Sequence, residues 1–178
     1  MAQIDDFKAN LLGGGARSNQ FRVTITPPAG IAIGLDVRRT SFLCKASSLP
    51  AVELGVIPLT YRGRTINIAG DRTTAAGAWE TTFYNDTDFM IRNALERWNN
   101  GINDFADNTG VSSMSDYATD LTVEQLDRDG TVLKSYIFRN AWPSTIAAIE
   151  LSSADETAIE EFVCTWQYQH FEASGVNF

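Results

Sequence analysis

The chain has 178 residues, of which 44% are hydrophobic and 20% charged, a balance typical of a globular protein rather than a disordered one. Its net charge of -8 argues against a general nucleic-acid-binding surface, which needs basic side chains to displace counterions. We expect one domain over residues 1–178, with an N-terminal arm at 1–20 and an extended arm at 47–72.

The N-terminal segment has neither a basic run nor a continuous apolar run, so we expect no signal peptide. No later stretch approaches the roughly 18 apolar residues of a membrane span. Residues 5–12 predict a short helix, which Gly13 to Gly15 would end. Residues 21–25 alternate apolar and polar side chains and predict a half-buried strand, stopped by Pro27 and Pro28.

The segment from residue 40 to residue 72 predicts extended chain. Residues 40–48 are interpreted as a strand, and residues 55–69 as a hairpin that turns at Arg62-Gly63. Pro50 and Pro58 restrict their neighbours to edges or irregular chain. The segment is rich in apolar side chains for one so broken by Pro and Gly, and such an exposed patch usually marks an interface.

The stretch Gly70-Asp71-Arg72-Thr73 is interpreted as a turn before a strand at residues 79–85. It could hold a phosphate, or it could be a shaped joint beside a subunit contact. The joint is favoured, because no helix begins there to bind an anion. Gly70 would permit the turn, Asp71 would cap it, and the Arg72 guanidinium could form two parallel hydrogen bonds to a carboxylate.

Residues 85–101 carry the strongest helix pattern. Asn85 or Asp86 would cap the first turn, and Gly101 would end the helix. Four apolar side chains recur at helical spacing and form one stripe: Ile91, Ala94, Leu95 and Trp98.

The last third predicts a polar loop at 103–116, a long hairpin turning at Asp129-Gly130, and a final strand at 161–171. Residues 152–160 are interpreted as one helical turn or a loop. One long helix beside many antiparallel strands indicates a mainly β (α+β) fold, an antiparallel β-sandwich or barrel with one flanking helix.

No motif for catalysis, a metal or a cofactor stands out. His170 is the one histidine, and Cys44 and Cys164 lack the partners of a zinc site, so we expect buried free thiols. Arg38 and Arg39 are interpreted as ion-pair partners. The tryptophans could line a sugar site of a carbohydrate-binding sandwich or an enzyme, but their apolar surroundings favour core packing; they are Trp79, Trp98, Trp142 and Trp166. A structural or binding domain is the preferred reading.

Several short motifs, in order, resemble those of the tail tube proteins of contractile-tailed, T4-like phages, whose relatives form the inner tubes of contractile injection systems and type VI secretion. They are FLCKASSLPA (42–51), IP (57–58), INIAGDRT (66–73), Trp79, ND (85–86) and WP (142–143). The resemblance covers residues 21–168. The sequence TAAGA after Thr73 departs from the family pattern.

The resemblance implies a non-enzymatic virion protein without a cofactor, whose six-membered rings stack into the tail tube through which the genome enters the host. The implied partners are further copies of the chain, the sheath, baseplate and tail-terminator proteins, the tape measure protein in the lumen, and double-stranded DNA that passes without specific binding. We expect synthesis in the host bacterial cytoplasm and no membrane insertion. The alternative is the inner tube of an injection or type VI secretion device that carries protein effectors.

Two sets of residues are candidates for the assembly. The arm would pack on the neighbouring ring through ten residues: Leu49, Pro50, Val52, Leu54, Val56, Ile57, Arg62, Arg64, Asp71 and Arg72. The alternative is an ordinary hairpin that covers its own core. Strand alternation makes Glu80, Asp120 and Glu124 candidates for lining the lumen, although such polar faces could equally meet outer solvent.

Overall fold

The computed structural model describes residues 4–72, 78–153 and 158–176, and each element below falls within these ranges. The helices are α1 (Ile4–Asn10), the short 3-10 helix η1 (Leu12–Gly14), α2 (Val37–Leu43), α3 (Met90–Ile102) and α4 (Met114–Tyr117). The strands are β1 (Phe21–Ile25), β2 (Cys44–Ser47), β3 (Leu54–Tyr61), β4 (Arg64–Arg72), β5 (Trp79–Tyr84), β6 (Thr119–Leu126), β7 (Val132–Ile146), β8 (Glu161–Gln167) and β9 (His170–Ala173).

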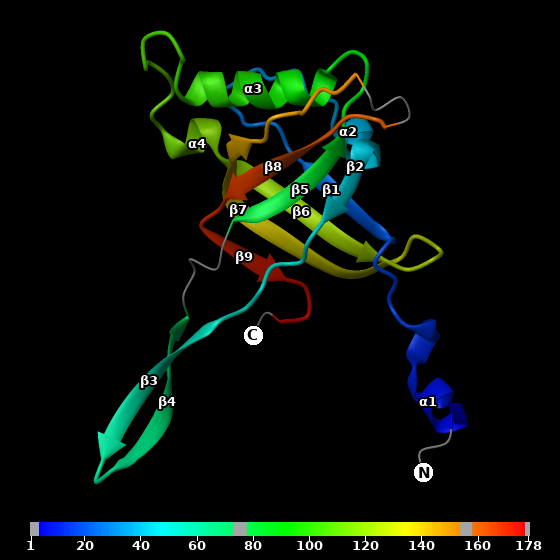
Figure 1. Ribbon diagram of the computed structural model, residues 1–178, viewed down its shortest axis with the longest axis vertical. Helices are drawn as coiled ribbons and strands as arrows, with labels where there is room; N and C mark the ends of the chain where they lie inside the picture. The colour runs from blue at the N-terminus through cyan, green and yellow to red at the C-terminus, as the bar shows by residue number, and fades with distance from the viewer. Residues whose placement is uncertain (1–3, 73–77, 154–157, 177–178) are drawn as a thin grey trace.

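The body of the molecule is a two-layered antiparallel β structure with α3 across one end (Figure 1). Its strands follow the order β1-β6-β7-β8-β5-β2, and β9 pairs with β7 beside this path. The long strand β7 belongs to both layers, because its first part pairs with β6 and β9 and its last part with β8. We call β1, β6, β9 and the first part of β7 the first sheet, and β2, β5, β8 and the end of β7 the second sheet. The expected antiparallel β fold is confirmed.

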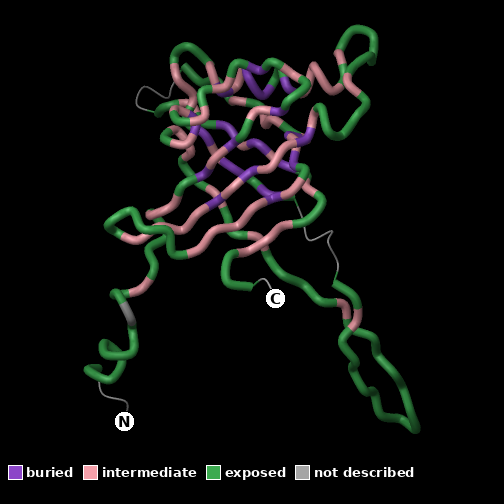
Figure 2. The backbone as a smooth tube through the Cα atoms, turned by 180° about the vertical axis from the view of Figure 1, so that it is seen from behind, coloured by how far each residue is buried: buried purple, intermediate pink, exposed green. Residues whose placement is uncertain are grey.

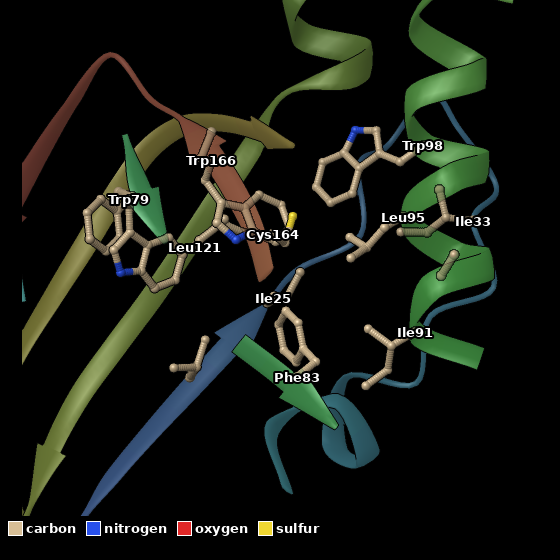
Figure 3. Close-up of a cluster of buried hydrophobic side chains, with 14 of the residues drawn as sticks. Ile25, Ile33, Trp79, Phe83, Ile91, Leu95, Trp98, Leu121, Cys164 and Trp166 are labelled. Carbon is tan, nitrogen blue, oxygen red and sulfur yellow. The ribbon is translucent and has the colours of Figure 1, made fainter. Parts of the chain in front are cut away.

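The inner faces of both sheets share one core (Figure 3). The Trp79 ring of β5 stacks on the Phe138 ring of β7, with their centroids 4.3 Å apart. Trp166 lies on β8 opposite Trp79, and its indole N–H donates to Thr81 Oγ1 at 2.8 Å. Strand alternation produces this arrangement, since every second side chain points inward.

Helix α3 closes the core with the predicted stripe, because Ile91, Ala94, Leu95 and Trp98 are all buried. The Trp98 ring meets the Trp166 ring edge-on at 5.7 Å, and its indole N–H donates to the Tyr117 carbonyl. Core packing is therefore confirmed for Trp79, Trp98 and Trp166. Trp142 is half-buried, edge-on to Tyr117.

Both predicted ends of α3 were wrong. The helix begins at Met90, whose N–H donates to the Asp88 carboxylate, while Asp86 pairs elsewhere. Gly101 lies inside the helix rather than ending it. A Cβ at that position would lie 2.7 Å from Ile31 Cγ2, so the glycine permits the close approach of a neighbouring segment.

The predicted strand at 40–48 was also wrong in its first half. Residues Val37–Leu43 form α2, and only Cys44–Ser47 are strand. The Asp36 carboxylate caps this helix by accepting the Arg39 N–H at 3.0 Å. The buried Thr40 hydroxyl donates to the Asp36 carbonyl, which further fixes the first turn.

The interpretation of Gly70 to Arg72 as a turn is corrected as well, because they lie within β4. Gly70 and Asp71 together oppose Gly55 of β3, which is a β-bulge. A Cβ on Gly70 would lie 3.1 Å from the Gly55 carbonyl oxygen. The glycine therefore serves a close approach of two strands rather than a loop.

Two smaller points complete the fold. The predicted polar loop at 103–116 contains the start of α4. The segment TAAGA (74–78), where the sequence departs from the tail tube pattern, lies outside the described ranges except for its last residue, and so do residues 154–157 of the predicted turn or loop. Among the helices that the structure describes, none combines the length and apolarity needed to cross a bilayer.

Candidate assembly surfaces

The hairpin of β3 and β4 projects away from the body (Figure 1), and nearly all of it is exposed (Figure 2). The two strands pair only with each other in the described part of the chain. They turn at Arg62 and Gly63, which have φ angles of 48° and 79°. Two successive positive φ angles define a type I′ turn, whose twist matches that of the flanking strands. The predicted hairpin and its turn are confirmed.

One face of this hairpin is almost entirely apolar. The register pairs Ile57 with Ile68 and Leu59 with Ile66, and Tyr61 with Arg64 beside the tip. Between 47% and 64% of each of the five apolar side chains remains exposed to solvent. The opposite face is more polar, with Thr60 beside Thr65. We call Ile57, Leu59, Tyr61, Ile66 and Ile68 the hairpin face.

The sequence reasoning found only part of this surface. The five apolar candidates Leu49, Val52, Leu54, Val56 and Ile57 are all exposed, whereas Pro50 is half-buried where the arm leaves the body. Four residues were missed, although the period-two alternation on both sides of the Arg62-Gly63 turn would have found them: Leu59, Tyr61, Ile66 and Ile68.

The charged candidates of the arm are exposed: Arg62, Arg64, Asp71 and Arg72. Within the described residues none of them makes an ion pair. The Arg62 guanidinium lies over the Tyr61 ring, 5.3 Å from its centroid. The hairpin tip therefore offers two cations to a partner.

The lumen candidates fall on two different surfaces. Asp120 and Glu124 lie on the outer face of β6 in the first sheet, where each is held by an arginine. Glu124 pairs with Arg22 at 2.6 Å, and Arg139 bridges Asp120 to Glu172 of β9. Hydrogen bonds from this arginine lower the pKa of the Glu172 carboxyl.

Glu80 is exposed on the outer face of β5, opposite Thr165, in the second sheet. Since both sheets turn their inner faces to the same core, their outer faces point in different directions. The structure therefore brings Asp120 and Glu124 together but keeps Glu80 apart from them.

The first sheet has two unpaired edges in the described part of the chain. Its order is β1-β6-β7-β9, so one edge belongs to β1 and the other to β9. A free edge presents a row of unpaired N–H and C=O groups to any strand that approaches it. Both edges are therefore candidates for pairing with a further strand.

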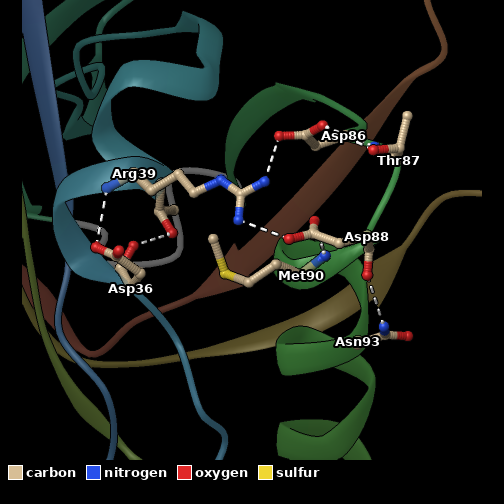
Figure 4. A network of polar contacts seen from close by, with 8 residues as sticks. Asp36, Arg39, Asp86, Thr87, Asp88, Met90 and Asn93 are labelled. Atoms are coloured by element: carbon tan, nitrogen blue, oxygen red, sulfur yellow. Dashed lines mark hydrogen bonds and ion pairs between the residues drawn. The ribbon is translucent and has the colours of Figure 1, made fainter.

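Arg39 belongs to the framework rather than to these surfaces (Figure 4). Its guanidinium joins α2 to the segment before α3 by pairing with Asp86 and Asp88. Hydrogen bonds from Arg39 hold the pKa of both carboxyls below their usual range. The expected ion-pair role is confirmed for Arg39, while the Arg38 guanidinium lies over the Phe42 ring.

The two cysteines and the histidine are not brought together in the structure. Cys164 is fully buried in the core, and Cys44 is half-buried, with burial raising the pKa of its thiol to about 12. His170 is exposed, 3.8 Å from Glu172. No group of three or more metal-binding side chains comes together among the residues described.

Comparison with known proteins decides the family. The profile of the phage tail tube protein family matches residues 16–174, nearly the whole chain. The chain belongs to this family. The tail tube protein of Serratia phage KSP90 is 28% identical over 170 residues, which cover 94% of this chain and 95% of that relative. Tail tube protein gp19 of Enterobacteria phage T4 is 29% identical over 171 residues, which cover 95% and 99%.

Solved structures share the fold of this tail tube protein at lower identity. The tube-terminating cap of the anti-feeding prophage matches with a TM-score of 0.59 at 16% identity, covering 89% of this chain and 90% of that one. The sheath-tube complex of an extracellular contractile injection system matches with a TM-score of 0.59 at 13% identity, covering 95% and 97%. Identities this low show a common fold alone. The resemblance found in the sequence is confirmed by the family match.

Proposed function

We propose that this tail tube protein forms six-membered rings that stack into the inner tube of a contractile phage tail, and that the genome enters the host through this tube. Family membership supports the structural role. The main observation in favour of ring assembly is that the first sheet has two free edges. The role requires no enzymatic activity and no cofactor. The protein would then reside in the virion after synthesis in the host cytoplasm.

Ring closure follows from the edges. β9 of one copy pairs with β1 of the next, and repetition around a rotation axis joins the first sheets into one continuous wall. A closed ring removes exposed strand edges, which otherwise invite uncontrolled association. Among the described strands, the second sheet ends at β2 on one side and continues through β7 into the first sheet on the other.

In this arrangement the outer face of the first sheet lines the lumen, with Asp120 and Glu124 on it, and Glu80 lies away from the channel. Two arginines, Arg22 and Arg139, pair with the three carboxylates Asp120, Glu124 and Glu172, so this face is polar and carries no excess of positive charge from these groups. A wall without excess positive charge does not hold DNA phosphates, which favours the passage of the genome.

The hairpin arm provides the axial contact. Its exposed apolar side chains would lie against the neighbouring ring, where Arg62 and Arg64 meet carboxylates. The remaining partners are the sheath protein around the tube, the baseplate and tail-terminator proteins at its two ends, and the tape measure protein in its lumen. The relatives named as phage tail proteins share 28–29% identity, which favours a phage over a protein-carrying injection device.

The test is electron microscopy of the purified protein. We expect six-fold rings or tubes, in whose density map Asp120 and Glu124 face the channel. A map that places these residues on the exterior would refute the lumen assignment. A variant with residues 52–57 replaced by a Gly-Ser linker should keep a folded body and form no long tubes. Normal tubes from this variant would exclude the arm as the axial contact.

Capsid, portal and terminase genes beside this gene would support the phage role. Effector genes without a capsid would support the injection device instead.

A further inference from the structure

A second apolar element projects from the molecule besides the hairpin. Helix α1 carries Ile4 and Phe7 at the spacing that places side chains on one face of a helix, and Leu11 follows directly after its last residue, Asn10. Ile4 is 71% exposed, Phe7 65% and Leu11 43%. No residue of α1 is buried.

Neither element is stable as an isolated piece. A helix of seven residues is too short to persist in water without packing, and a lone two-stranded hairpin is marginal at best. Each therefore needs a surface outside its own element. Both extend from the same end of the body but on opposite sides of it, so they lie far apart within one copy (Figures 1 and 2).

We propose that α1 of one copy packs on the hairpin face of a second copy, a contact that rests on the assembly proposed above. Copies of one ring stand side by side, so the helix on one flank of a body comes next to the hairpin on the facing flank of its neighbour, and the hairpin with this helix on it then meets the neighbouring ring. The two surfaces match in length. Seven helical residues span about 10 Å, and the hairpin face from Ile57 to Tyr61 spans about 13 Å.

Charge fixes the direction of the packing. The first turn of α1 is acidic, with Asp5 and Asp6, and the Asp5 side chain is 83% exposed. The hairpin tip is basic, with Arg62 and Arg64. The acidic turn therefore lies at the tip, with Ile4 near Tyr61, Phe7 near Leu59 and Ile66, and Leu11 near Ile57 and Ile68.

Disulfide cross-linking tests the contact directly. The double variant Phe7→Cys with Ile66→Cys places a thiol on each proposed surface, in a Cys44→Ala background. The matched control is Phe7→Cys with Thr65→Cys, whose second thiol lies one residue away on the opposite hairpin face. Cys164 stays in both, because it is fully buried.

We expect a ladder of disulfide-linked oligomers from the first pair, with about tenfold higher yield than from the control, because thiols held together react at a high effective concentration. Mixing the single variants Phe7→Cys and Ile66→Cys should give linked dimers and nothing larger. Equal yields from both pairs, or assemblies visible by microscopy without a ladder, would overturn the contact while leaving the tube function intact. A fast-migrating monomer would show that the helix folds onto its own hairpin, and would also overturn it. Wild-type protein that forms no assemblies, together with a Phe7→Cys/Ile66→Cys variant that gives no ladder, would reject both proposals.

Charge exchange gives an independent readout. Asp5→Lys with Asp6→Lys, or Arg62→Glu with Arg64→Glu, should raise the concentration needed for assembly several-fold at low salt. Combining the four changes should restore it, because the pairs are re-formed with reversed sign. Exposed pairs are screened, so the effect should shrink at high salt. Additive damage in the combined variant would contradict the pairing.

Discussion

The body and the hairpin arm of this protein differ in how far their apolar side chains are buried. In the body, Trp98, Trp166, Phe83 and Phe138 are each fully buried. In the arm, every large apolar side chain is about half exposed or more. The body is therefore stabilised by contacts within the chain, whereas the apolar surface of the arm is exposed and available to bind another molecule. Substitutions should thus affect stability in the one region and assembly in the other.

The largest effect is expected from the core. Trp98→Ala removes a buried ring and leaves the Tyr117 carbonyl without its indole donor. The free energy of unfolding should fall by about 3–5 kcal/mol. Urea unfolding followed by tryptophan fluorescence measures it. Leu59→Ala, in the half-exposed hairpin face, is the matched control and should leave the midpoint almost unchanged. A similar loss in both variants would abolish the distinction between body and arm.

The second prediction concerns a substitution that should affect assembly but not stability. Ile57→Asn with Ile68→Asn makes a cross-strand pair of the hairpin face polar, and assembly should be lost because its apolar contact is removed. The melting curve of the body should not move. The control, Thr60→Asn with Thr65→Asn, changes one cross-strand pair on the opposite face, three pairs nearer the tip, and should still assemble. Sedimentation and microscopy distinguish assembled from unassembled protein, and tubes formed by the isoleucine variant would contradict the prediction.

A smaller, pH-dependent effect is expected inside the body. Arg39 lowers the pKa of Asp86 and Asp88, so its contribution to stability is present above their unfolded pKa and disappears as pH falls through the folded values. Arg39→Met should therefore lower the urea midpoint at pH 7. The two curves should converge only below the ordinary carboxyl range (about pH 4), as pH falls through the lowered folded pKa values of the wild type.

Arg38→Met is the control, since Arg38 makes no ion pair among the described residues. Curves for Arg39→Met and wild type that stay parallel down to pH 2.5, a pH chosen well under the carboxyl range (about 4), would show that the ion pairs are not the cause.

The sequence alone predicted those features whose causes are local. The two hairpin turns follow from Gly63 and Gly130, which accept positive φ, and the α3 stripe follows from helical spacing. Helix α2 was missed because Thr, Phe and Cys favour a strand, while the Asp36 cap and the burial of Thr40 decide otherwise.

Features that depend on distant residues were beyond local reasoning. Gly70 looks like a turn residue until Gly55 is known to lie against it, and Gly101 looks like a helix end until Ile31 is placed beside it. The lumen candidates show the same limit. Alternation identifies Glu80, Asp120 and Glu124 as outward residues, but only the sheet topology shows that Glu80 belongs to another surface.

The smallest effect tests how closely the arm's own geometry is tied to assembly. Gly63 has a φ of 79° at the hairpin tip, and no atom lies within 4 Å of where its Cβ would be. Gly63→Ala thus adds backbone strain without a clash, of about 1 kcal/mol. Since 1.4 kcal/mol is a factor of ten, the concentration needed for assembly should rise about fivefold while the body melts normally. Gly63→Asn should rescue most of this loss, because Asn tolerates the left-handed conformation. If Ala and Asn behaved alike, the shape of the turn would not matter to the contact, and the arm would bind through its apolar face alone.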